Sequence, residues 1–363
     1  MKRRIPMIAL LIALVMLMSA CAIPGNLFKG NEAIPANLQE GNNYKADMEN
    51  GNNTNVTNSR VWPWEDPSIT LPPFTGEVTE PGSVKSLKVL AFGDSSSKDS
   101  MQFLAKLAIE AGVEDVKIAV LYRNAGGALD GQSDDFVNNT DGYTYYEDTG
   151  DGWVTTANAK PQDTLQSEKW DFVIVHQNLC NHPDKATYTK LPTFVAAIHN
   201  LLRVGDGENK NPTAKILWLQ VWAYEINNRN NLYNHTKYYK NPTTGNYDQM
   251  LMYTTAIETI QSLVLTKPNI DGIIPAGTAV QNMRESYWSD GMTREAEFLT
   301  NTGKVLAALM LFKSLTGYDV NGMEMSDPAF DHARPHLGVI KESVNNAYLN
   351  PFAVSSSVYH IDN

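Results

Sequence analysis

The chain has 363 residues, of which 42% are hydrophobic and 19% are charged, and its formal net charge is −11 at pH 7. This acidic balance argues against binding to nucleic acid and against electrostatic attraction to anionic lipids, because both require a basic surface. The sequence contains no CxxC pair and no HExxH motif, so we expect neither a metal site nor a cofactor.

Residues 1–20 predict a signal peptide. Lys2–Arg4 precede an apolar run, 5–18, which is short for a transmembrane helix but typical of a signal-peptide core. The run ends in Met18-Ser-Ala-Cys21, which resembles the cleavage box of bacterial lipoproteins, although Met18 stands where Leu is usual. We therefore expect Cys21 to carry a lipid and to hold the chain at the extracytoplasmic face of a bacterial cell envelope. The alternative is a plain secretory signal with an incidental cysteine.

Residues 21–85 are rich in Asn, Gly, Pro and Thr. They predict a disordered, lipid-anchored tether, because this composition buries too little apolar area to offset chain entropy. An α/β domain is expected over 86–358, followed by a tail over 359–363. Strand and helix signals alternate in the domain, which predicts a mostly parallel sheet with helices on both faces. The predicted strands span 88–92, 116–122, 170–175, 215–220 and 272–275, and predicted helices span 191–202, 247–265 and 301–315.

The first strand leads through Gly93 and Asp94 into Ser95, and apolar residues then recur at helical spacing from Met101 onward. A tight glycine turn between a strand and a helix presents a serine hydroxyl beside the free N–H groups of the first helical turn. Acyl-transfer enzymes expose their nucleophile and stabilise an oxyanion in this way. Ser95 is therefore a candidate nucleophile. The alternative is that its hydroxyl only caps the helix.

Other polar groups follow the carboxyl ends of the next strands. Gly126 and Gly127 permit close approach of the backbone to a ligand, or form a plain turn. The loop 176–184 contains amides, two imidazoles and a thiol, and residues 222–247 form a long polar loop of a length that often carries function. Residues 142–156 predict a surface hairpin with an aromatic face.

In this order, several motifs together resemble the SGNH (GDSL-type) hydrolases, and more closely an uncharacterised branch of that superfamily. The resemblance covers about residues 87–358 and implies a three-layer α/β/α sandwich of the SGNH hydrolase-like, flavodoxin-like kind. In active relatives it implies hydrolysis of esters, often of acyl groups on carbohydrates. The motifs are Gly93–Ser95, Tyr122-x4-Gly127, Trp170–Val173, Gln220-x-Trp222-Ala-Tyr224, Ile274–Arg284 and Ala347–Phe352.

The resemblance makes Ser95 the nucleophile and implies an oxyanion hole around it. That hole would use the N–H of Ser95, the N–H of Gly126 or Gly127, and a side-chain amide. The usual Gly-x-Asn-Asp block is absent here, and the amide is therefore expected from Gln177 or Asn178.

In the resembling family an Asp-x-x-His unit before the last helix supplies the base. This chain has Thr293-Arg-Glu-Ala-Glu-Phe-Leu-Thr300 there, which puts Glu295 at the acid position and Phe298 at the histidine position. Serine is a poor nucleophile without an adjacent base, and phenylalanine has no lone pair to accept the proton. Losing the base typically costs about a million-fold in turnover. The ordinary mechanism of the superfamily is therefore not expected here.

Three routes to catalysis without the usual histidine remain open. His176 or His182 approaches Ser95 from the loop after the third strand. Glu295 acts as the base itself, if burial raises its pKa. Cys180 with His182 forms a separate thiol nucleophile, although a lone cysteine on a loop is usually a bystander.

We expect a catalytically degenerate monomer that binds a carbohydrate or an acylated glycan at the former active site. The ligand would contact amides and aromatic rings, which suit carbohydrate but also suit ordinary packing. The rings in question are Trp222, Tyr224, Tyr233, Tyr238 and Tyr239. One alternative is a weak serine esterase that removes acyl groups from carbohydrate with a base other than the usual histidine. Another is a structural lipoprotein that keeps the fold and has an idle pocket.

Overall fold

The computed structural model describes residues 83–123, 128–226 and 239–360. The expected signal peptide, Cys21, nearly all of the tether, and Gly126 with Gly127 lie outside these ranges. Within them, seven strands form one sheet: β1 (Ser86–Gly93), β2 (Asp115–Arg123), β3 (Tyr143–Asp148), β4 (Val154–Ala159), β5 (Phe172–Val175), β6 (Lys215–Leu219) and β7 (Gly272–Ile274). A second, two-stranded sheet consists of β8 (Thr293–Arg294) and β9 (Phe298–Leu299).

The large sheet has the order β4-β3-β2-β1-β5-β6-β7. β1 lies parallel between β2 and β5, and β5, β6 and β7 continue the parallel part. Among these five strands the sequence order is second, first, third, fourth, fifth, which is the flavodoxin-like order, and the direction of winding reverses between β1 and β5. The expected α/β fold with a mostly parallel sheet is confirmed.

The predicted hairpin forms as β3 and β4, but it is not a separate surface insertion. β3 pairs antiparallel with β2, with Tyr146 opposite Val120, so the hairpin extends the edge of the central sheet. Pairing with β2 satisfies backbone N–H and C=O groups that an isolated hairpin would leave to water.

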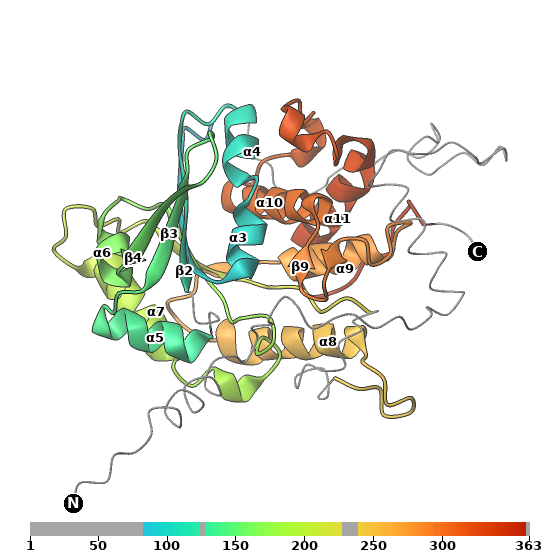
Figure 1. Ribbon diagram of the computed structural model, residues 1–363, viewed down its shortest axis with the longest axis horizontal. Helices are drawn as coiled ribbons and strands as arrows, with labels where there is room; N and C mark the ends of the chain where they lie inside the picture. The colour runs from blue at the N-terminus through green and yellow to red at the C-terminus, as the bar shows by residue number, and fades with distance from the viewer. Residues whose placement is uncertain (1–82, 124–127, 227–238, 361–363) are drawn as a thin grey trace, which may run out of the picture. The chain divides into compact units, whose positions relative to one another are not determined.

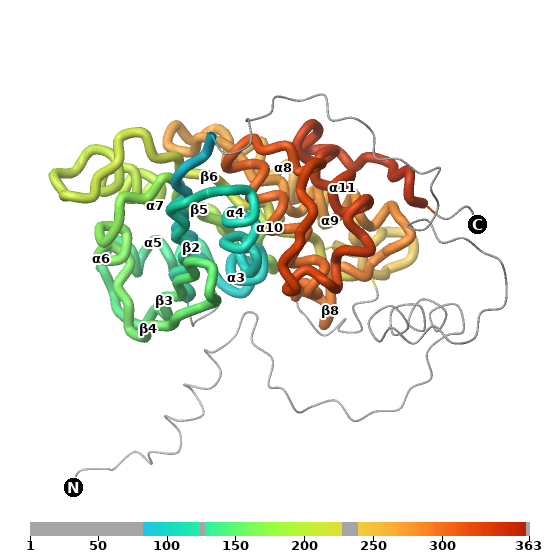
Figure 2. Tube along the Cα trace, turned by 90° about the horizontal axis from the view of Figure 1, so that it is seen from above, coloured from blue at the N-terminus to red at the C-terminus, as the bar shows by residue number. Residues whose placement is uncertain are grey.

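Helices cover both faces of the sheet. Figures 1 and 2 show α5, α6 and α7 on one side and α3, α4, α9, α10 and α11 on the other. Their bounds are α3 (Ser95–Met101), α4 (Leu104–Glu110), α5 (Leu129–Asn138), α6 (Pro161–Gln166), α7 (Leu191–His199), α8 (Gln249–Thr259), α9 (Ala276–Arg284), α10 (Asn301–Thr316) and α11 (Leu337–Leu349). No helix in the described ranges is long and apolar enough to span a membrane.

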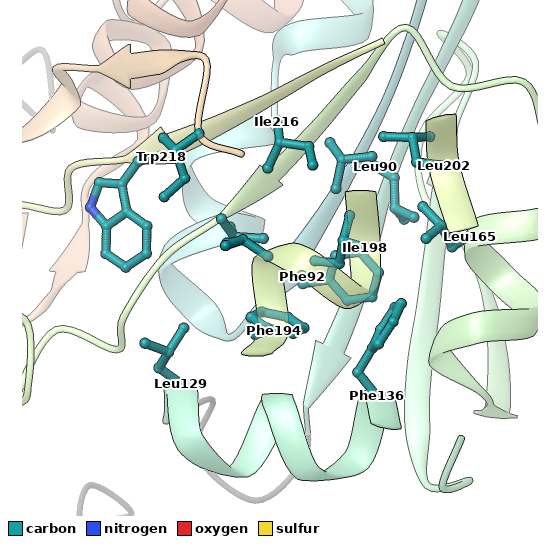
Figure 3. Packing of buried hydrophobic residues seen from close by; sticks show 14 of the residues in the cluster. Leu90, Phe92, Leu129, Phe136, Leu165, Phe194, Ile198, Leu202, Ile216 and Trp218 are labelled. Atoms are coloured by element: carbon teal, nitrogen blue, oxygen red, sulfur yellow. The ribbon is translucent and has the colours of Figure 1, made fainter. Parts of the chain in front are cut away.

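A buried apolar cluster fills the space between the sheet and α5, α6 and α7 (Figure 3). Phe92 of β1, Phe136 of α5 and Phe194 of α7 meet edge to face, with ring centroids 5.6 to 5.8 Å apart. Edge-to-face rings add stabilisation beyond the area that they bury. The cluster fixes the strands whose carboxyl ends hold the polar residues described below.

On the opposite face, α10 begins and ends where the sequence predicts. The Thr300 hydroxyl accepts a hydrogen bond from the N–H of Gly303, and Gly317 ends the helix with φ of 71°. A hydroxyl at the N-cap and a glycine in the left-handed region after the last turn satisfy end groups that the helix leaves unpaired. These two residues therefore fix the position of α10 immediately after β9.

Candidate functional site

The turn between β1 and α3 places Ser95 at the start of the helix. The Asp94 carboxylate accepts a hydrogen bond of 2.8 Å from the N–H of Ser96, and Asp94 is therefore the N-cap. The alternative interpretation of Ser95 as the cap was wrong, because the aspartate one residue earlier already fills that position. Ser95 is half-buried, and no residue in the described ranges forms a hydrogen bond with its hydroxyl.

His176 lies near this turn but pairs with a different serine. Its Nε2 is 2.6 Å from the Oγ of Ser97, and its Nδ1 is 2.8 Å from the carbonyl oxygen of Gln177. Ser95 and Ser97 are two positions apart on a helix and therefore point to different sides of it. The imidazole reaches the side that faces the sheet, where Ser97 is fully buried.

His182 does not reach Ser95 either. Its ring stacks on Trp218 at 6.3 Å between centroids, and neither of its nitrogens has a hydrogen-bond partner within the described ranges. Burial, with a smaller contribution from His176, lowers the pKa of His182 to about 3 and keeps it neutral. The structure therefore brings neither of the proposed substitute histidines to Ser95.

The Gln177 amide connects loops instead of facing a ligand. Its oxygen accepts from the N–H of Leu129 and of Asn178, and its nitrogen donates to the carbonyl and hydroxyl oxygens of Thr187. Both hydrogens of the amide are thus used within the protein. Asn178 is 3% exposed, and its side-chain oxygen accepts from the N–H of Asn181 at 3.2 Å. The structure gives both amides a role in shaping the loop after β5.

The β8–β9 hairpin carries the segment that replaces the expected acid–histidine unit. The N–H of Leu299 donates to Asp99 at 2.9 Å, and this bond holds β9 against α3. Phe298 is half-buried, with the guanidinium carbon of Arg294 5.4 Å from the centre of its ring. The Glu295 side chain is 69% exposed and forms an ion pair with Arg294. Glu295 therefore faces water instead of the serine. Its proposed role as a base required burial, and the structure does not bury it.

Glu297, which the sequence analysis did not single out, is the acidic residue of this hairpin that turns inward. It is half-buried, and its carboxyl has no hydrogen-bond partner in the described ranges. Burial raises its pKa to about 7, with further contributions from the charges of Asp94, Asp99 and Glu295. No sequence pattern separates it from Glu295, because residues two apart in a regular strand face the same side. The two acids differ here because Glu295 and Ala296 have positive φ and form the turn that precedes Glu297.

Tyr122, at the end of β2, belongs to the same group. Burial raises the pKa of its hydroxyl, and the charges of Asp94 and Glu297 add to the effect. Tyr122 pairs with Gly93, the residue before Asp94, in the β1–β2 ladder, and the bond from the Leu299 N–H to Asp99 holds the hairpin of Glu297 against α3. Three elements that are distant in sequence thus converge on the edge of the sheet where Ser95 begins α3.

A row of half-buried rings continues from Tyr122 along the hairpin. Tyr146 lies 5.9 Å from Tyr122 and 6.1 Å from Trp153 between ring centroids, in edge-to-face geometry. The ammonium of Lys98 is 3.9 Å from the centre of the Tyr146 ring, which is a cation–π distance. The predicted aromatic face of the hairpin therefore lies next to α3 and Ser95.

The rings of the long loop after β6 are placed differently. Trp222 is 1% exposed, and its indole N–H donates to the carbonyl oxygen of Glu297 at 2.7 Å. Tyr224 and Tyr239 are also buried, while Tyr233 and Tyr238 lie outside the described ranges. The described rings of this loop are therefore interior packing residues. Trp222 in particular fixes the backbone that presents Glu297.

Replacing Glu297 by glutamine is expected to raise the free energy of unfolding at about pH 8 and to change it little at about pH 4. The folded protein holds the Glu297 proton up to a pKa of about 7, against 4.5 for an ordinary glutamate. The wild-type protein therefore loses stability as the pH rises through that interval, because the unfolded chain releases the proton first. Glutamine has no charge to bury, and it removes this loss.

Urea unfolding of both proteins at the two pH values measures the effect. Glu258→Gln is the matched control, since that side chain is exposed and its charge is not among those that raise the pKa of Glu297, and its difference from wild type should change little with pH. An equal effect of Glu297→Gln at both pH values would contradict the expected burial of the carboxyl.

The comparisons with known proteins identify the family of this fold. No curated protein matches the chain. The crystal structure of a DUF4886 family protein from Bacteroides uniformis ATCC 8492 is similar, with a TM-score of 0.64 and 28% sequence identity over 75% of this chain and 98% of that chain. A family model described as a domain of unknown function, DUF4886, matches residues 88–330, from β1 through the segment after α10. Since the match spans more than half of the sequence, this chain belongs to the DUF4886 family.

Proposed function

We propose that this protein is a lipid-anchored, SGNH hydrolase-like protein that binds a carbohydrate or an acylated glycan at the carboxyl edge of its sheet. The anchor is inferred from the Met18–Cys21 box, and the superfamily from the motifs that surround Ser95. In open α/β sheets, ligands bind outside the carboxyl ends of the strands, where the winding reverses. Here that point lies between β1 and β5, directly beside Ser95.

One observation carries the proposal. Ser95, Tyr122 and Glu297 are half-buried, and no residue in the described ranges forms a hydrogen bond with their hydroxyl or carboxyl groups. Polar groups that the fold leaves unsatisfied are available to a ligand. Two hydroxyls and a carboxyl that holds its proton up to about pH 7 both donate and accept hydrogen bonds, which suits the hydroxyls of a sugar.

Binding without turnover follows from the environment of Ser95. No imidazole in the described ranges is hydrogen-bonded to its hydroxyl, because His176 pairs with Ser97 and His182 stacks on Trp218. Without an adjacent base a serine hydroxyl stays protonated and reacts slowly.

The test is binding of the full chain, in detergent, to a panel of acetylated and unacetylated oligosaccharides, followed by calorimetry with the strongest of them. Tyr122→Phe removes only the hydroxyl and is expected to weaken binding by about threefold to tenfold. Tyr145→Phe is the matched control, because that hydroxyl is bonded to Glu147 and the side chain packs against the apolar cluster on the other face. Equal affinities of the two variants, or no binding to any member of the panel, would reject the proposal.

A second candidate, a weak esterase, is favoured by the position of Glu297. A carboxyl with a pKa of about 7 is matched to proton transfer near neutral pH, and the bond from the Leu299 N–H to Asp99 holds the hairpin that carries Glu297 against α3. Hydrolysis of p-nitrophenyl acetate that rises through about pH 7 and disappears in both Ser95→Ala and Glu297→Gln would establish this candidate in place of simple binding.

A further inference from the structure

Ser97 and His176 form a buried pair at the point between β1 and β5 where the winding of the sheet reverses. The Ser97 Oγ is 2.6 Å from Nε2 of His176, and Nδ1 is 2.8 Å from the carbonyl oxygen of Gln177. A carbonyl oxygen only accepts, so Nδ1 carries the proton of the neutral ring and Nε2 keeps its lone pair. The Ser97 hydroxyl therefore donates to Nε2.

This geometry meets the requirements for an activated serine. A nucleophile needs a base within about 2.6–3.2 Å, and the base needs a third group that fixes its tautomer and orientation. Ser97, His176 and the Gln177 carbonyl fill these three positions. Asp94 Oδ1 is 3.9 Å from Nε2, and a carboxylate at that distance stabilises the imidazolium that forms when the proton moves.

Gly93 allows the pair to sit this close to the end of β1. A Cβ built on Gly93 would lie 2.1 Å from Nε2 and 2.2 Å from the Ser97 Oγ, both far inside van der Waals contact. The glycine thus brings backbone directly against the nucleophile and the base. Glycine serves the same purpose at ligand-binding turns, where it lets the backbone come close to the ligand.

We propose that Ser97, with His176 as its base, is the nucleophile of a slow acyl-transfer activity toward small esters. The Ser97 oxygen adds to the ester carbonyl carbon as its proton passes to Nε2. The tetrahedral intermediate expels the alcohol oxygen, which takes that proton and leaves the acyl group on Ser97. A water molecule then adds to the acyl carbon, gives its proton to Nε2, and releases the carboxylic acid as the proton returns to Ser97.

Burial sets the rate of this activity and limits its substrates. Ser97 and His176 are each 0% exposed, so an ester reaches the oxygen only while a segment that covers the pair is displaced and the pair itself stays intact. Opening of one short segment is a local event that does not require global unfolding. The activity therefore favours small acyl groups. It goes beyond glycan binding at Ser95 and does not depend on it.

The test treats the full chain with an alkyl fluorophosphonate, in which the serine oxygen attacks phosphorus, fluoride leaves, and the hydroxyl proton passes to the base. Tandem mass spectrometry then locates the adduct among the serines of α3. The expected result is a single adduct on Ser97, formed about a hundredfold or more slowly in His176→Gln, which keeps a hydrogen-bond partner for Ser97 but no strong base. His199→Gln is the matched control and should label at the wild-type rate.

An adduct on Ser95, no adduct after prolonged treatment, or an unchanged rate in His176→Gln would each overturn the proposal. Thermal unfolding of His176→Gln establishes that the variant is folded before its labelling rate is measured. The position of the adduct in the wild-type protein is a test that needs no variant. Glycan binding is measured separately on the same protein. Glycan binding without a Ser97 adduct would reject only the acyl-transfer activity. A Ser97 adduct without glycan binding would reject only the glycan proposal.

Discussion

Replacing Arg284 by alanine is expected to lower the free energy of unfolding by about 3–5 kcal/mol. The Arg284 side chain is 4% exposed, and its guanidinium pairs with Asp290 at 2.6 Å. It also donates to the side-chain oxygen of Gln281 and to the carbonyl oxygen of Ala223. Without the arginine, Asp290, whose side chain is 15% exposed, would lose the cation that pairs with its carboxylate. Removing one partner of a buried pair costs far more than an exposed pair contributes.

Urea unfolding followed by circular dichroism measures this loss, and Arg294→Ala is its control. The Arg294 side chain is 46% exposed and its partner Glu295 is 69% exposed, so the control should differ from wild type by less than about 1 kcal/mol. Comparable losses in both variants would contradict the structural role of Arg284. Because Arg284 also lies within hydrogen-bond reach of the Thr293 hydroxyl, its loss should loosen the hairpin that carries Glu297.

Replacing Gly93 by alanine is expected to destabilise the protein by about 3 kcal/mol, the upper end of the usual cost of overpacking. The new methyl group would meet both Nε2 of His176 and Oγ of Ser97 at distances that no real Cβ contact shows. Neither neighbour is the free end of a flexible chain, since each is fully buried and hydrogen-bonded to the other. The pair would have to separate, which leaves buried polar atoms unsatisfied.

Differential scanning calorimetry gives the change in melting temperature for this variant. Gly322→Ala is the matched control, because no atom lies within 4 Å of the Cβ built at that position, and it should be nearly neutral. If the Gly93→Ala protein were as stable as the control, the expected cost would be contradicted, because the Ser97–His176 pair could then move aside for a methyl group without loss of stability.

The fold is predictable from sequence wherever burial is continuous. The strands β1, β5 and β6 are apolar runs because parallel strands are covered on both faces, and α10 is bounded by Thr300 and Gly317. α5 was not predicted, since Leu129 and Phe136 are the only apolar side chains among its buried residues. α9 was missed because its buried positions include polar side chains such as Thr278, whose hydroxyl bonds Gln220 and Pro351.

The candidate site is predictable only in part. Ser95 follows from a local pattern of strand, glycine turn and helix, and its place at the edge of the sheet needs no tertiary information. The pairing of His176 with Ser97 depends on which side of α3 faces β5, and that is decided by packing. The choice between Glu295 and Glu297 depends on the direction of the β8–β9 hairpin. Single-sequence patterns contain neither of these orientations.

The bonds of Asp99 connect parts of the chain that are made at very different times. Asp99 binds the N–H of Leu299, 200 residues later, and the ammonium of Lys304. At a synthesis rate of about 5–20 residues per second, Leu299 is added to the chain about 10–40 s after Asp99. Until then α3 has neither partner, and the carboxylate of Asp99 is exposed to solvent and to chaperones. The contact between α3, which begins at Ser95, and β9 therefore forms late in synthesis. Any product that terminates before β9 lacks this contact.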